Sequence, residues 1–159
     1  MVYSKVIVQD YVMIRGENVV HYFYIINDFQ ISKIIEKMGD KHLSFREKII
    51  LNNFIFKNSS QGLKISDDIF RRLNHVEFRS FFYNSEFENK GFNYYGITII
   101  PFSSLNKVKD SFLNLTKEEY TRLEDIYISK QEYEVIVKDL IDLFNKAIQN
   151  KLPIIHYGI

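Results

Sequence analysis

Cysteine and tryptophan are both absent from this sequence of 159 residues, and the lack of cysteine excludes disulfide bonds and thiolate chemistry. Its 6 glycines are isolated from one another, so there is no glycine-rich phosphate-binding loop. No apolar run approaches the roughly 18 residues that a membrane-spanning helix requires. The start, MVYSKVIVQD, reaches Asp10 before any run of signal-peptide length. We therefore expect a soluble, cytoplasmic protein without a membrane partner.

The charges nearly cancel, with 21 Lys and Arg against 20 Asp and Glu. A net charge of +1 gives no overall positive field, so we expect no nucleic-acid partner. Aromatic residues are abundant instead, with 14 Phe and 11 Tyr, and we expect them to dominate the core. A chain of this length can bury a core of its own, and we expect residues 1–159 to form a single domain.

Apolar and β-branched runs predict strands in five segments: 2–14, 19–26, 75–83, 92–100 and 154–159. The run 92–101 (FNYYGITIIP) ends at a proline and, with 75–83, predicts a central hairpin closed by a polar loop. The first two segments flank a turn at 15–18 and predict another hairpin. Segment 19–26 is apolar on both faces, so we expect it in the centre of the sheet or beneath a helix. We expect the apolar tail 154–159 to join the sheet as well.

Capping residues followed by apolar residues at helical spacing predict helices over 29–38, 44–57, 66–73, 103–113, 117–127 and 130–150. Asp28 is the expected N-cap of the first. Segment 44–57 is ambiguous, because IILNNFIF also fits a strand, and the capping box of Ser44 and Glu47 favours the helix. The polar run 58–64 (NSSQGLK) predicts a loop and a boundary between subdomains. Together these segments predict an α+β fold with a mostly antiparallel sheet and helices packed mainly on one face.

The sequence contains no recognisable metal or cofactor motif. Its 4 histidines, His21, His42, His75 and His156, are scattered, and those on predicted strands are expected to be hydrogen-bonded sheet residues. We therefore expect no metal and no cofactor.

Two alternative functions stay open at this point. The alternating residues His75, Glu77 and Arg79, with Glu86 and Glu88 nearby, would suit a small metal-dependent hydrolase or nuclease. The simpler interpretation is the solvated face of an amphipathic hairpin. A nucleic-acid-binding regulator from a mobile element is the other alternative, although Arg71 and Arg72 form only a small basic cluster.

Charge is uneven along the chain, and residues 115–145 carry eight acids against four bases. Acidic helical faces with exposed tyrosine suit a basic protein partner. The ordinary alternative is a solubilising helix surface. The partner-binding residues predicted here are Glu118, Glu119, Glu124, Asp125 and Tyr127. A rival surface lies on the loop of the central hairpin, with Tyr83, Glu86 and Glu88.

The run 94–101 (YYGITIIP), then Ser104 and Leu105, an acidic helix pair and the tail 156–159 (HYGI) resemble small immunity proteins of bacterial polymorphic-toxin and contact-dependent growth inhibition systems. The resemblance covers roughly the C-terminal 70 residues and carries no motif from which a functional residue can be assigned. It implies a non-enzymatic cytoplasmic protein. Such a protein binds a cognate toxin domain, often a nuclease, and blocks its active site or substrate entry.

Overall fold

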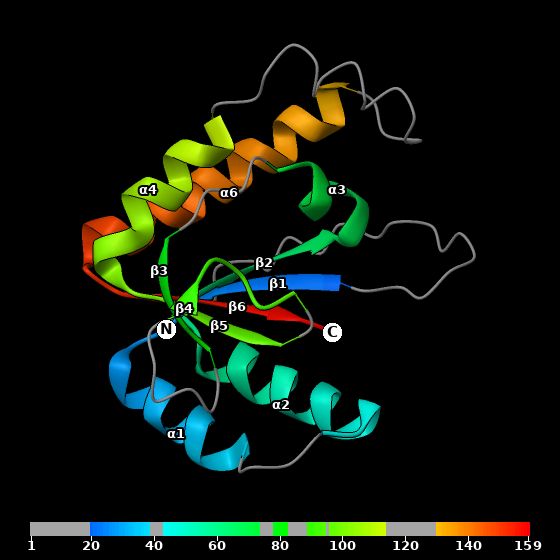
Figure 1. Cartoon of the computed structure of the whole chain (residues 1–159), viewed down its shortest axis with the longest axis vertical. Helices are drawn as coiled ribbons and strands as arrows, with labels where there is room; N and C mark the ends of the chain where they lie inside the picture. Colours follow the sequence, from blue (N-terminus) through cyan, green and yellow to red (C-terminus); the bar gives the residue numbers. More distant parts are fainter. Residues whose placement is uncertain (1–19, 39–42, 74–77, 83–88, 95, 114–129) are drawn as a thin grey trace.

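The computed structural model describes residues 20–38, 43–73, 78–82, 89–94, 96–113 and 130–159. Its elements follow in the order β1 (Val20–Ile25), α1 (Asp28–Met38), α2 (Phe45–Asn58), β2 (Gln61–Ser66), α3 (Asp67–Arg72), β3 (Arg79–Phe82), β4 (Asn89–Lys90), β5 (Ile97–Ile100), α4 (Phe102–Leu113), α6 (Lys130–Asn150) and β6 (Ile154–Gly158). The strands form one six-stranded sheet between two layers of helices (Figure 1).

The sheet has the order β2-β1-β6-β5-β3-β4, and every neighbouring pair is antiparallel. Strand β6 lies between β1 and β5, with Tyr157 opposite Tyr22 on one side and Ile97 on the other. The tail predicted to join the sheet is thus one of its internal strands. Strand β1 is internal too, as its two apolar faces predict. The predicted α+β class with an antiparallel sheet is confirmed.

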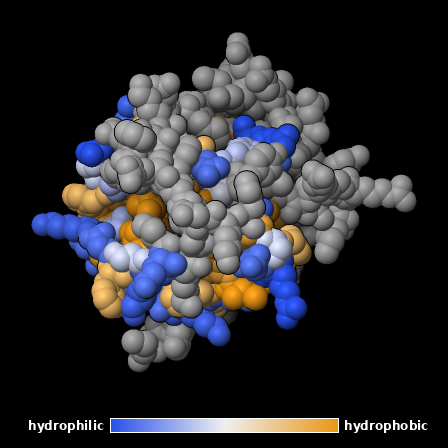
Figure 2. Space-filling model, turned by 60° about the horizontal axis from the view of Figure 1, so that its bottom comes forward, coloured by the Kyte–Doolittle hydropathy of each residue, from blue (hydrophilic) through white to orange (hydrophobic). Residues whose placement is uncertain are grey.

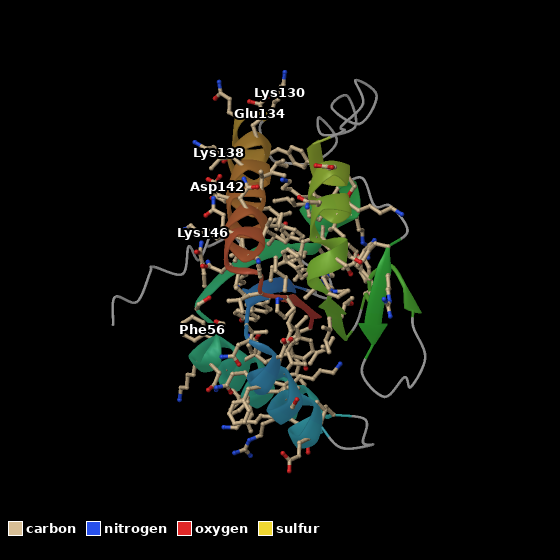
Figure 3. The ribbon with its side chains drawn as sticks, turned by 90° about the vertical axis from the view of Figure 1, so that its left-hand side faces the viewer. Phe56, Lys130, Glu134, Lys138, Asp142 and Lys146 are labelled. Atoms are coloured by element: carbon tan, nitrogen blue, oxygen red, sulfur yellow. The ribbon has the colours of Figure 1, made fainter. Side chains whose placement is uncertain are left out.

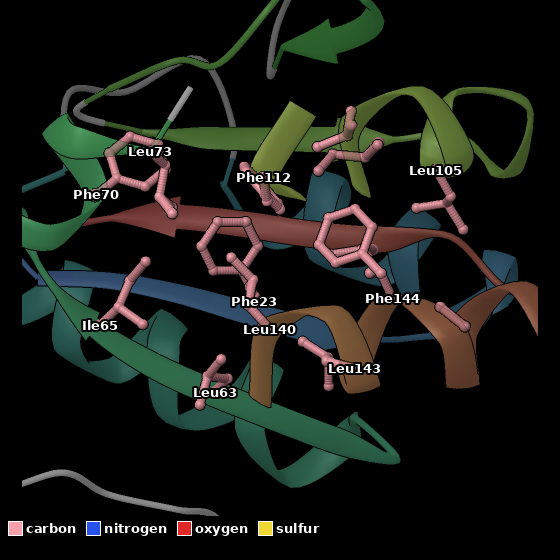
Figure 4. Close-up of a cluster of buried hydrophobic side chains, with 14 of the residues drawn as sticks. Phe23, Leu63, Ile65, Phe70, Leu73, Leu105, Phe112, Leu140, Leu143 and Phe144 are labelled. Carbon is pink, nitrogen blue, oxygen red and sulfur yellow. The ribbon is translucent and has the colours of Figure 1, made fainter. Parts of the chain in front are cut away.

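Side chains of β1 and of Ile26, which follows it, alternate between two cores. Phe23 and Ile25 face the layer of α3, α4 and α6, whereas Tyr24 and Ile26 face α1 and α2. Figure 4 shows the first core, in which Phe23 packs among side chains from β2, α3, α4 and α6. Helices were expected mainly on one face, and α3, α4 and α6 follow that expectation. A second layer is present because the central strands are apolar on both faces, and each face needs a cover.

Helix α6 spans the residues that the sequence predicts. Six of its side chains are buried along one stripe: Tyr133, Ile136, Leu140, Leu143, Phe144 and Ala147. Burial of each larger one contributes roughly 1.5–3 kcal/mol, which makes this stripe the main attachment of the helix to the sheet. The helix ends where Lys151 adopts a left-handed backbone, with φ 54°, and the Leu152 N–H donates to the Ala147 carbonyl at 2.9 Å.

Helix α2 occupies the segment that was ambiguous in the sequence, and the preferred helix is confirmed. The capping box is complete: the Ser44 N–H donates to the Glu47 carboxylate at 2.7 Å, and the Glu47 N–H donates to Ser44 Oγ at 3.3 Å. These two bonds satisfy backbone groups that the first helical turn leaves without partners.

The predicted loop over 58–64 is wrong, because α2 runs to Asn58 and β2 begins at Gln61. Leu63 and Ile65 are buried in the first core, so β2 is a proper edge strand. Gly62, which belongs to the polar run, permits a close approach: a Cβ there would lie 2.6 Å from Cδ1 of Tyr24. The expected subdomain boundary is therefore continuous sheet.

Other boundaries also move. The strand expected over 92–100 is only Ile97–Ile100, because the Asn93 N–H donates to Thr98 Oγ1 at 2.7 Å and folds the preceding residues back. The N-cap of α1 is Asn27, whose side chain accepts from the Gln30 N–H at 2.9 Å, and Asp28 is the first helical residue. Helix α4 begins at Phe102, before the expected caps Ser103 and Ser104. The expected N-terminal partner 2–14 and helix 117–127 lie outside the described residues.

Candidate functional site

All eight partner-binding residues predicted from the sequence lie outside the described part of the chain: Tyr83, Glu86, Glu88, Glu118, Glu119, Glu124, Asp125 and Tyr127. Of the alternative hydrolase set, His75, Glu77, Glu86 and Glu88 also fall outside it. Arg79 is described: it lies exposed on β3, opposite Lys90 of β4. Two other features of the described residues are candidates for a functional site, a buried polar network and an exposed apolar helix face.

The buried network joins side chains from four parts of the fold. His21 of β1 and His156 of β6 meet with Nδ1 and Nε2 at 2.9 Å. His21 Nε2 lies 3.0 Å from Asp67 Oδ1, at the start of α3. Arg71 Nε donates to Asp67 Oδ2 at 2.7 Å, and the Tyr94 hydroxyl donates to the same carboxylate. We refer to these five residues as the histidine network.

The carboxylate fixes the direction of these hydrogen bonds. Asp67 accepts, so His21 carries its proton on Nε2, and its Nδ1 accepts from Nε2–H of His156. His156 Nδ1 then accepts from the Thr98 hydroxyl at 3.4 Å. With each ring carrying one proton, the chain of donors and acceptors runs in one direction from β5 to α3.

The histidine network is largely buried. Both imidazoles are 0% exposed, and the Phe70 ring stacks on His21 with centroids 3.9 Å apart. Burial and the bond to Asp67 raise the pKa of Tyr94 to about 12. Only Arg71 reaches well into solvent, with 59% of its side chain exposed. Both imidazoles are thus enclosed, and the network ties β1, β6 and α3 together.

Within the described ranges, no group of three or more His, Asp and Glu side chains is arranged to hold a metal ion. In the same part of the chain, no helix combines the length and the apolar character needed to cross a membrane.

The second candidate is the outward side of α2. Large apolar side chains stand in solvent there, with 70% of Phe45 and 59% of Ile50 exposed, beside exposed Ile49 and Phe56. Figure 2, which brings the α1 and α2 side forward, shows apolar side chains at the surface among charged ones. On neighbouring α1, Phe29 is also exposed, with Lys33 Nζ 4.4 Å above its ring. Exposed apolar side chains gathered on one helix are a feature of interaction surfaces in soluble proteins.

The exposed charged side chains of α2 differ in sign between its outward side and the side nearer the sheet. Arg46, Asn53 and Lys57 are exposed next to the apolar residues. Glu47 is exposed too, but it falls one turn before the buried Leu51, and its carboxylate accepts from the Ser44 N–H. We define the α2 face by its outward residues, which are Phe45, Arg46, Ile49, Ile50, Asn53, Phe56 and Lys57. Its charges are all positive.

The solvent side of α6 has a different character. Five residues spaced four apart alternate in sign, Lys130, Glu134, Lys138, Asp142 and Lys146, and Figure 3 shows them in a row along the helix. Lys130 Nζ lies 3.8 Å from Glu134 Oε1. Each charge thus has an opposite neighbour on its own helix, which is typical of a solvated face.

Sequence reasoning found part of this arrangement. His21 and His156 are hydrogen-bonded sheet residues, as predicted. Their bonds to each other and to Asp67 were missed, since only the pairing of β1 with β6 brings these distant positions together. The α2 face was missed too, although its signal was present in the run IILNNFIF, which is apolar beyond what one buried helix face needs.

Comparison of the chain with protein-family models, curated proteins and solved structures finds no match.

Proposed function

We propose that this chain is an immunity protein, which binds a cognate bacterial toxin domain in the cytoplasm and blocks its active site or substrate entry. In this proposal the chain acts by stoichiometric binding rather than by catalysis, and it needs no cofactor. The observation that carries the proposal is the α2 face, an exposed apolar surface on a helix held firmly to the sheet.

The resemblance of the sequence to immunity proteins is the other support for the proposal. The segments in which it lies include β5 and β6, which are paired neighbours with Ile97 opposite Tyr157. Their side chains are almost all buried in the sheet. These segments therefore belong to the scaffold and leave few side chains exposed for contact with a partner.

Co-purification tests this proposal. A tagged form of the chain is isolated from its own host at moderate salt, and the bound proteins are identified and quantified by mass spectrometry. We expect one partner at a ratio close to one to one, with a toxin domain at its C-terminus. Recovery of the chain alone, or with nucleic acid, would contradict the proposal.

The same complex tests the acidic surface predicted from the sequence. Reversing the charges of Glu124 and Asp125 should weaken binding if that surface contacts the toxin domain. Unchanged affinity in the double variant eliminates that surface and leaves the proposed function intact.

A further inference from the structure

We infer that the α2 face is the surface on which the toxin domain docks, and that the docking site on the toxin is an apolar groove rimmed by carboxylates. This inference rests on the proposed function and adds to it the place of binding and the chemistry of the partner. Sequence reasoning had placed binding on acidic residues, which suit a basic partner, so the α2 face assigns the opposite polarity.

The anchoring of α2 makes its outward side a rigid platform. Leu51 and Ile55 are buried against the sheet, and the Tyr24 hydroxyl of β1 donates to Asn52 Oδ1 at 2.8 Å. The capping box holds the first turn, and the Ser59 N–H donates to the Phe56 carbonyl at 3.3 Å at the other end. A partner that binds this helix does not have to order it first, which lowers the entropic cost of association.

The order of side chains on α2 fits a groove. Phe45, Ile49 and Phe56 follow one another at helical spacing and make an apolar ridge. Arg46, Asn53 and Lys57 run beside that ridge at the same spacing. An amphipathic helix that offers apolar anchors to a groove is a common mode of protein recognition. The two cations in that row, Arg46 and Lys57, add the requirement that carboxylates lie along one rim of the groove.

Two other occupants fit the surface less well. A second copy of this chain would set Arg46 and Lys57 against the same cations, and like charges oppose such a contact. Anionic membranes attract clusters of about 4–8 Lys and Arg, whereas the α2 face has Arg46 and Lys57 around a central Asn53. A protein groove also satisfies the Asn53 amide, which a lipid interior does not.

The test uses the full chain and the toxin domain recovered with it, with affinity and association rate measured by surface plasmon resonance. The apolar variant combines Phe45→Ala, Ile49→Ala and Phe56→Ala, and we expect it to lose at least about 100-fold in affinity. The charge variant combines Arg46→Glu and Lys57→Glu. We expect it to associate about 10-fold more slowly at low salt, with a smaller difference at high salt.

Matched controls lie on the opposite helix layer. Phe102→Ala with Val135→Ala removes exposed apolar groups, and Lys107→Glu with Lys146→Glu reverses two exposed charges. Both controls should bind as the wild type does, and circular dichroism should show all four variants folded. If the α2 variants bind the toxin domain as tightly as the controls do, the docking site is wrong and the proposed function stands. If the toxin domain does not bind the wild-type chain, both proposals fail.

Separate measurements test the two other occupants of the α2 face, a membrane and a second copy of this chain. One result would assign the face to a membrane. In that case the wild-type chain co-sediments with phosphatidylserine vesicles but not with phosphatidylcholine vesicles, and the charge variant co-sediments with neither. A dimer in light scattering that becomes a monomer in the apolar variant would assign it to a second copy. Either result overturns the inference. We expect a monomer that binds neither vesicle.

Discussion

The histidine network shows how single polar residues are accommodated inside the sheet. His21, His156 and Thr98 are all 0% exposed, yet each has hydrogen-bond partners within the network. Burying a polar group without a partner costs about 1–3 kcal/mol, so the hydrogen bond between the two imidazoles helps to stabilise both of them there. Asp67 depends less on His21, because its carboxylate also accepts from Arg71 and Tyr94.

Replacing either histidine alone should therefore lower the free energy of unfolding by more than half of the loss expected when both are replaced. His21→Phe and His156→Phe are each expected to lower the free energy of unfolding by about 1–3 kcal/mol, because each removes a buried hydrogen-bond partner of the other imidazole. The double variant should lose clearly less than the sum of the two single losses. Urea unfolding of the four proteins measures this coupling. Additive losses would show that the two rings do not depend on each other.

Strand β6 is an element that other backbone segments approach closely. It lies between β1 and β5, and the Gly158 N–H donates to the Gly96 carbonyl at 3.1 Å. The backbone of Tyr94 passes directly over Gly158, where an added Cβ would lie 1.9 Å from the Tyr94 carbonyl oxygen. Only glycine at this position allows that approach, which brings the Tyr94 segment down onto the sheet.

Gly158→Ala should consequently force backbone atoms apart and lower the free energy of unfolding by about 1–3 kcal/mol or more. Gly96→Ala is the control, because a Cβ there meets the end of the Asn93 side chain at 2.5 Å, and that side chain can turn aside. Thermal and urea unfolding of both variants provide the comparison. Equal losses in the two variants would mean that the close approach of Tyr94 carries no special cost.

The elements also show how far sequence reasoning reached. Helix α6 and strand β6 were predicted because one apolar stripe and one apolar tail leave little alternative. Strand β2 was missed because Gly62 is read as a loop signal until the Tyr24 ring beside it is known. Helix α2 was ambiguous because it is apolar on its outward side as well as its buried side. The local pattern is unclear at the residues that we propose for binding, and conflicts between local pattern and fold are expected at functional sites.

At the scale of the whole molecule, the two helix layers present different surfaces. The charges along α6 compensate one another from Lys130 to Lys146 on the helix itself. The layer of α1 and α2 leaves apolar side chains in solvent, with Phe29 65% exposed and Phe45 70% exposed. We propose the layer of α1 and α2 as the side that binds a partner. The sheet between the two helix layers holds α2 in place.

Stoichiometric neutralisation is the central claim, and a titration of toxin activity tests it most directly. A fixed amount of the cognate toxin domain is assayed with increasing amounts of this chain. We predict that activity falls in proportion to the added chain and vanishes at about one equivalent, because each bound chain blocks one active site or substrate entry. Full activity in the presence of excess chain, or inactivation by far less than one equivalent, would contradict the claim.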